Sequence, residues 1–188
     1  MPVRTQTLPL GGPLLIVPER HEDARGWIAE SYNDYELAEA IGRDVEFRQD
    51  IDVFSAQSGT LRGLHFQHPP FAQAKLVRVV RGAILDVLVD IREGSPTFGQ
   101  HTKIALDQAS GHQLWIPEGF AHGMLSTRVN TQVAIKVSAI HAPHAAGRIR
   151  WDDPLLFIDW GVEDPIVSEN DRRAPEFKDL ARPIAVPL

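Results

Sequence analysis

The chain reads Gly111-His-Gln-Leu-Trp-Ile-Pro-Glu-Gly-Phe-Ala-His122 a little past its midpoint, and this stretch gives the clearest indication of the fold. Its glycine, proline, glycine and histidine are separated by five, one and two residues in turn. Apolar residues stand on both sides of Pro117-Glu-Gly119, and proline and glycine form turns. We therefore expect a hairpin here, with His122 just after its turn.

Short apolar segments recur on either side of that hairpin. Runs rich in Val, Ile and Leu cover 76–80, 83–91, 101–106, 113–116 and 132–138, with turn signals such as Arg81-Gly82 and Glu93-Gly-Ser-Pro96 between them. Repeated short strands are typical of a β-sandwich or a barrel. Helices are expected only at the edges, over 34–41 and 174–180. The pattern predicts an all-β protein with a barrel core over about 45–141 and a few short peripheral helices.

Length and composition narrow the class of protein. The 188 residues contain no repeat and no flexible linker, so we expect a single domain over 1–188. The absence of cysteine excludes disulfides and thiolate zinc sites and favours the cytoplasm. The net charge is −6 with both signs interspersed, and no apolar run approaches the roughly 18 residues of a spanning helix. Neither nucleic acid nor a membrane is an expected partner.

Two histidines stand in spacings that resemble the two cupin motifs. The Gly111–His122 stretch resembles the second motif, and Gly59, followed after five residues by His65, resembles the first. The resemblance implies a cupin-type jelly-roll β-barrel. Interior positions of a small barrel point at one another, so both histidines are expected to face one cavity.

The first motif lacks the usual metal ligands. Metal-binding cupins carry a second histidine and a glutamate there, whereas this chain has Gln67 and no glutamate over 68–75. A transition metal would keep only His65 and His122, fewer than the three protein ligands typical of a catalytic site. We expect no metal and no other cofactor, which argues against a metal-dependent cupin oxygenase or isomerase.

Several longer runs match one family in collinear order over about residues 20 to 180. They include Leu61-Arg-Gly-Leu-His-Phe-Gln67, Ala72-Gln-Ala-Lys-Leu-Val77, Ser95-Pro-Thr-Phe-Gly99, Trp115-Ile-Pro-Glu-Gly-Phe-Ala-His-Gly123 and Arg150-Trp-Asp-Asp-Pro154. They resemble the dTDP-4-dehydrorhamnose 3,5-epimerase family. The resemblance implies a homodimeric isomerase of deoxysugar and polysaccharide biosynthesis. It would epimerise C3, C5 or both of a nucleoside-diphosphate 4-keto-6-deoxy sugar through an enolate.

Such chemistry needs a base, an enolate stabiliser and an acid on the opposite face. The resemblance implies His65 as the base, since imidazole titrates near neutrality, and Asp171 as the carboxylate that orients it. Lys75 would place positive charge beside the enolate oxygen. Substrate contacts are expected from Arg25 and Arg62 at the diphosphate, from Glu30 and Gln73 near the nucleotide, and from Asp86, His122 and His141 in the cavity.

The chain differs from the family at the residue that serves as the general acid. The family carries a tyrosine opposite the histidine, and Ile135 takes its place here. Ile51 and Val53 replace an asparagine and a serine, and Ile140-His141 replaces an aromatic pair. Three outcomes stay open. Water or His141 returns the proton, giving a slower or single-centre epimerase; the altered wall accepts another keto-sugar; or the protein binds a nucleotide sugar without turnover.

Two other functions compete with epimerisation as interpretations of the sequence. The sugar 3,4-ketoisomerases have a related barrel and a histidine base, although the runs around His65 and His122 resemble the epimerases more closely. A cupin sugar sensor would carry a DNA-binding module, and the sequence shows neither a helix-turn-helix segment nor a basic stripe. Epimerisation is therefore the preferred hypothesis.

Overall fold

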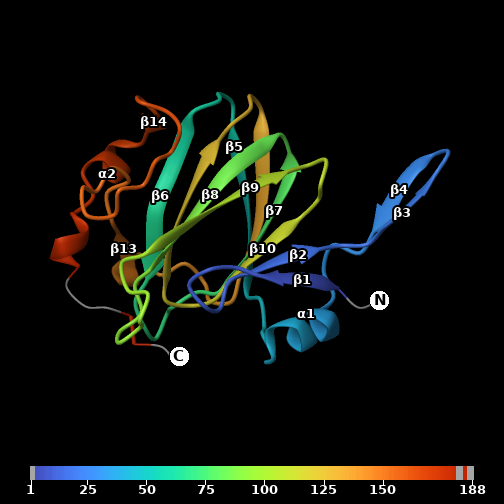
Figure 1. The fold of residues 1–188 in the computed structure, drawn as a ribbon, viewed down its shortest axis with the longest axis horizontal. Coiled ribbons are helices and arrows are strands. Elements are labelled where there is room, and N and C mark those ends of the chain that lie inside the picture. Colours follow the sequence, from blue (N-terminus) through green and yellow to red (C-terminus); the bar gives the residue numbers. More distant parts are fainter. Residues whose placement is uncertain (1–2, 181–183, 186–188) are drawn as a thin grey trace.

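The computed structural model describes residues 3–180 and 184–185. Its strands form two large sheets and one separate hairpin (Figure 1). The first sheet has the order β1-β2-β10-β7-β12-β5, with bounds Arg4–Thr7, Leu14–Val17, Gln113–Ile116, Lys75–Arg81, Thr131–Val137 and Gln49–Ser55. The second has the order β13-β6-β11-β8-β9, with bounds Ala146–Arg148, Thr60–Gln67, Phe120–Ser126, Ala83–Asp90 and His101–Asp107. In addition, β14 (Ile166–Val167) pairs with β6 in parallel.

Side-chain alternation explains why these segments form facing sheets. In β12, Val133, Ile135 and Val137 are buried between the sheets, and the residues between them are only partly buried. In β8, alternate residues face that interior, while Val87 and Val89 pack against the C-terminal segment around Trp160. A strand buried on both faces reads as the continuous apolar run seen in the sequence. The prediction of an all-β protein is confirmed.

Helices are few, as expected, but one lies in a different place. Helix α1 (Asp34–Ile41) has the predicted bounds, and the Asn33 side chain caps it by accepting from two backbone N–H groups. The short helix predicted near 174–180 is present only as a 3₁₀ helix at Phe177–Asp179. The structure has α2 at Glu169–Arg172 and 3₁₀ turns at Phe177–Asp179 and Pro143–Ala145. Ser168 caps α2 early, and Pro175 lacks the N–H that a continuing helix would use.

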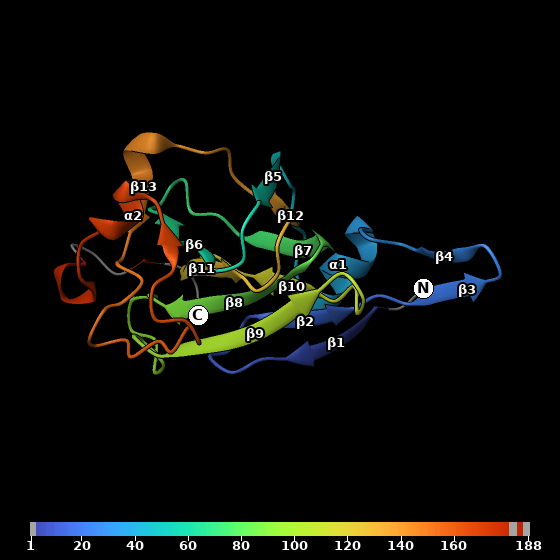
Figure 2. The same cartoon turned by 90° about the horizontal axis from the view of Figure 1, so that it is seen from above.

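A two-stranded hairpin of β3 (Arg20–Asp23) and β4 (Gly26–Ala29) stands apart from both sheets. Figures 1 and 2 show it projecting from the body of the protein, on the side away from α2. Its strands pair only with each other among the described residues. The hairpin therefore exposes Trp27 and Ile28, which are 56% and 72% accessible.

A glycine on β6 holds the two histidine-bearing strands together. Gly63 has φ +128°, and a Cβ there would lie 2.5 Å from Gly123 Cα and 2.8 Å from the His122 carbonyl oxygen. Backbone strain and overpacking together should make Gly63→Ala destabilising by about 3 kcal/mol or more. Urea unfolding would measure the change.

The matched control for Gly63→Ala is Gly59→Ala. Gly59 also has a positive φ, +79°, but a Cβ there would meet nothing within 4 Å. Its replacement should cost only about 1 kcal/mol, because backbone strain acts without a clash. Equal losses for the two variants would show that the close strand contact does not matter for stability.

Candidate active site

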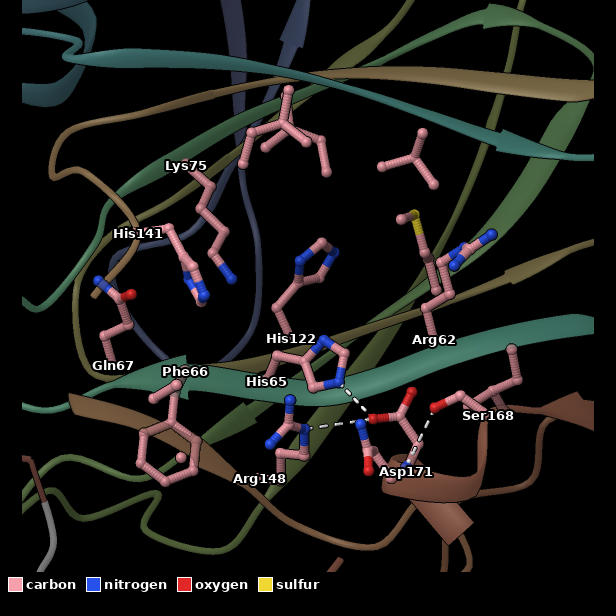
Figure 3. A pocket seen from close by; sticks show the side chains of 18 of the residues that line it. Arg62, His65, Phe66, Gln67, Lys75, His122, His141, Arg148, Ser168 and Asp171 are labelled. Atoms are coloured by element: carbon pink, nitrogen blue, oxygen red, sulfur yellow. Dashed lines mark hydrogen bonds and ion pairs between the residues drawn. The ribbon is translucent and has the colours of Figure 1, made fainter. Parts of the chain in front are cut away.

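One cavity of about 610 Å³ lies between the two sheets and is closed on one side by β13, β14 and α2. A volume of this size is typical of small-ligand sites. His65 on β6 and His122 on β11 are directly opposite each other in the second sheet, and both line the cavity (Figure 3). The pairing of β6 with β11 places both histidines in one cavity, as expected from the sequence.

His65 is backed by a carboxylate. Its Nε2 lies 2.6 Å from Asp171 Oδ1, and Asp171 is 4% exposed. Burial alone would raise the pKa of Asp171, but the hydrogen bond and charge of His65, with help from Ser168 and the Gly63 N–H, hold that pKa below its usual value. The ionised carboxylate therefore accepts the Nε2 proton, which leaves the Nδ1 lone pair of His65 free to act as a base.

A second histidine–carboxylate pair lies deeper in the barrel. His122 Nε2 is hydrogen-bonded to Asp86 Oδ1, and the two residues are 5% and 0% exposed. Burial lowers the pKa of His122 more than the charge and hydrogen bond of Asp86 raise it, so this imidazole is neutral near pH 7. The other carboxylate oxygen, Asp86 Oδ2, is buried and has no hydrogen-bond partner among the described residues.

Lys75 enters the same cavity from β7 of the first sheet. It is 9% exposed, and burial lowers its pKa to about 8, against the opposing charge of Asp86. At neutral pH the ammonium form still predominates. An amine with a pKa near 8 can both stabilise a developing negative charge and release a proton.

The rest of the first-sheet wall is apolar. Ile51 and Val53 from β5 and Ile135 and Val137 from β12 line the cavity there. Ile51 is directly opposite Ile135, which is in turn opposite Val77 on β7. The Ile135 side chain thus lines the cavity at the position where the family carries its proton-donating tyrosine.

The other predicted contacts divide into two groups. Arg62, Gln73 and His141 line the cavity. Arg25 and Glu30 do not line it: Arg25 is at the tip of the hairpin in an exposed pair with Asp23, and Glu30 accepts from Asn33 beside α1. Within one chain Arg25 is separate from the site because the hairpin points away from the barrel (Figure 2).

Arg148 and Met124 are among the cavity residues that the sequence did not indicate. Arg148 on β13 is opposite His65, and its Nε lies 3.5 Å from Asp171 Oδ1. Met124 on β11 also lines the cavity. Arg148 belongs to no recognisable spacing, because β13 joins β6 only through tertiary pairing.

The described ranges contain no group of three or more His, Cys, Asp or Glu residues placed to hold a metal ion. His65 and His122 instead each have a single carboxylate partner. A search for long apolar helices in the same ranges found none that could span a membrane.

The fold and the cavity define a class: a cupin-type jelly roll with a carboxylate-backed histidine facing a buried lysine. Comparison with known families gives a match to one family over most of the chain. The family model described as dTDP-4-dehydrorhamnose 3,5-epimerase matches residues 7–179. The chain belongs to the dTDP-4-dehydrorhamnose 3,5-epimerase family.

Individual proteins agree with the family match. The dTDP-4-dehydrorhamnose 3,5-epimerase of Sinorhizobium fredii is 41% identical, over 93% of this chain and 90% of its own length. The Legionella pneumophila epimerase, solved with dTDP-4-keto-L-rhamnose, superposes with a TM-score of 0.93 at 33% identity and covers 99% of this chain and 100% of its own.

A 3'-monoepimerase from Streptomyces bikiniensis, solved with dTDP-quinovose, superposes with a TM-score of 0.88 at 31% identity, over 95% of this chain and 91% of its own. The comparisons confirm the family, the jelly-roll fold and the activity predicted from sequence. The protein is an isomerase that epimerises a sugar.

Proposed function

We propose that the substrate is a nucleoside-diphosphate 4-keto-6-deoxy sugar and that His65 removes the proton from C3, C5 or both. The observation that carries this proposal is the His65–Asp171 pair, which leaves Nδ1 as the free basic atom in the cavity. The ligands named for the Legionella and Streptomyces structures, dTDP-4-keto-L-rhamnose and dTDP-quinovose, support the substrate class.

Each step uses a group already placed in the cavity. His65 Nδ1 takes the carbon-bound proton, and the C–H electron pair moves to the C4 oxygen as an enolate. The Lys75 ammonium stabilises that oxygen, because charge interactions are strong where water is scarce. Arg62 offers a guanidinium at the cavity wall for the diphosphate. Asp171 keeps the imidazolium that forms in place.

The test is deuterium incorporation followed by NMR, with dTDP-4-keto-6-deoxyglucose as the probe in heavy water. We expect deuterium at C3, at C5 or at both, and the labelled positions report which centres are activated. dTDP-glucose, which lacks the ketone, should exchange nothing. Appearance of a 3-keto product would identify a 3,4-ketoisomerase. Binding without any exchange would reduce the protein to a nucleotide-sugar-binding cupin.

We also propose that the protein is a homodimer in which the β3–β4 hairpin packs on a second copy. The hairpin carries exposed Trp27 and Ile28, and Arg20 stacks 4.3 Å from the centre of the Trp27 ring. Apolar side chains on a projecting arm are unfavourable in water unless a partner covers them. Packing of this kind would also bring Arg25 and Glu30 next to another chain.

Charge reversal on the hairpin tests the homodimer. Trp27→Glu/Ile28→Glu should give a monomer in sedimentation velocity at micromolar concentration, because an interface cannot bury two unpaired carboxylates without a large desolvation cost. Leu155→Glu, at a 61% exposed site in the C-terminal segment, is the matched control and should remain dimeric. A wild-type protein that sediments as a monomer would disprove the proposal.

A further inference from the structure

Inversion of a carbon centre needs a proton donor on the face opposite the base. His65 belongs to the second sheet, so that donor has to come from the first sheet or from the segments next to it. The cavity-lining residues that the first-sheet strands supply are Ile51, Val53, Lys75, Ile135 and Val137. Among these described residues, Lys75 is the only one with an ionisable side chain.

The placement of Lys75 suits such a donor. Figure 3 shows the Lys75 and His65 side chains entering the cavity from opposite sides. Within the described ranges, no hydrogen bond or ion pair fixes Lys75 Nζ, so its protons are free for a ligand. Asp86 from β8 and His122 from β11 interact electrostatically with Lys75. The other charged and titratable residues that line the cavity are Arg62, His65, His141, Arg148 and Asp171.

We propose that Lys75 Nζ delivers the proton to the carbon face opposite His65, in addition to stabilising the enolate. This inference rests on the proposed function. The buried Asp86 carboxylate, with Oδ2 unpartnered among the described residues, favours the return of Lys75 to its charged form after each turnover. A depressed pKa of about 8 makes the ammonium a more effective acid than an exposed lysine.

The step balances in protons and electrons. His65 Nδ1 gains the carbon proton, and the C–H pair becomes the enolate. A Lys75 N–H bond then breaks, its proton bonds to the opposite face of the carbon, and its electron pair stays on the neutral amine. The ketone re-forms. Water at the cavity mouth takes the proton from His65 and supplies one to Lys75, which restores the starting state.

His141 is the competing donor. It lines the cavity, but it lies beyond the end of β12 in an exposed position, where its backbone N–H donates to the Gln49 side chain 2.9 Å away. An exposed imidazole is in contact with water, whereas the Lys75 ammonium is buried in the cavity. The geometry therefore favours Lys75 over His141.

Lys75→Arg separates proton donation from charge stabilisation, because a guanidinium keeps its charge but does not give up its proton. In heavy water, His65 still removes and returns a proton on its own face. Exchange with retained configuration should therefore stay within about tenfold of wild type, while the inverted product falls by at least about 100-fold. The ratio of inversion to exchange is the readout.

A second change should restore inversion. Ile135→Tyr in the Lys75→Arg background puts a phenol on the same wall, and we expect at least about tenfold recovery of inverted product. His141→Ala should change the ratio of inversion to exchange by less than about threefold, because in this proposal Lys75 and not the exposed His141 donates the proton. If Lys75→Arg does not fold by circular dichroism, Lys75→Gln replaces it, with the same fall in the ratio expected.

The ratio should also depend on pH. Lys75 is protonated below its pKa of about 8 and loses that proton above it, so wild-type inversion should fall relative to exchange as pH rises through about 8. In Lys75→Arg the ratio of inversion to exchange should not change between about pH 7 and pH 9, because arginine keeps its proton there.

Other outcomes would overturn the assignment to Lys75. Inversion retained in Lys75→Arg, loss of inversion in His141→Ala, or an equal loss of exchange and inversion in both Lys75 variants would each do so. A wild-type protein that exchanges no proton would instead refute the proposed function itself.

Discussion

His65→Gln is expected to lower deuterium incorporation into the keto-sugar by at least about 10³-fold. His65 Nδ1 is the basic atom that the Asp171 hydrogen bond leaves open to the cavity, and a glutamine amide cannot accept the carbon proton. The measurement is the NMR exchange experiment at pH 7. Exchange within tenfold of wild type would exclude His65 as the base.

The same substitution at His68 provides the control. His68 stacks edge-on against Phe66 and does not line the cavity, so His68→Gln should retain full exchange. The His65 side chain is 41% exposed, and its replacement should change the free energy of unfolding by no more than about 1 kcal/mol. A loss of activity in His65→Gln would then report chemistry and not unfolding.

Asp171→Asn is expected to lower exchange by up to about 10⁴-fold, the loss known for a catalytic histidine whose orienting carboxylate becomes an amide. The amide can donate a hydrogen bond to His65 Nε2, which moves the ring proton to Nδ1 and blocks the basic atom. The imidazolium that forms during proton removal also loses its counter-charge. Because the pKa of Asp171 is below its usual value, the carboxylate stays ionised across the neutral range in the wild type.

Nitrogen NMR of the His65 ring distinguishes this positioning role from a structural one. The wild type should show a protonated Nε2 and Asp171→Asn a protonated Nδ1, while Asp164→Asn, at an exposed site, should change neither tautomer nor rate. Because His65 and Asp171 act as one unit, the double variant should be no more than about tenfold slower than His65→Gln alone. An unchanged tautomer in Asp171→Asn would contradict the argument.

Short sequence patterns predicted the elements whose formation depends on neighbouring residues, such as strands between turns and a capped helix. The strand at 83–91 and its neighbours follow from apolar runs between glycine and proline turns, and helix α1 follows from its Asn33 cap. The helix expected near 174–180 formed only as a 3₁₀ helix at Phe177–Asp179. Strands β3 and β4 were not foreseen, since four-residue strands with exposed side chains carry no alternation to detect.

The family, the all-β class and the identity of His65, Lys75 and Asp171 as candidates followed from sequence, because spacing and residue type are properties of the chain. Only the tertiary structure showed that Arg148 reaches Asp171, that Asp86 pairs with His122, and that Ile135 and Lys75 share the wall facing His65. These relations depend on the register of strands far apart in the chain. A shift of one residue would reverse every side chain between cavity and surface, and no short run of residues specifies that register.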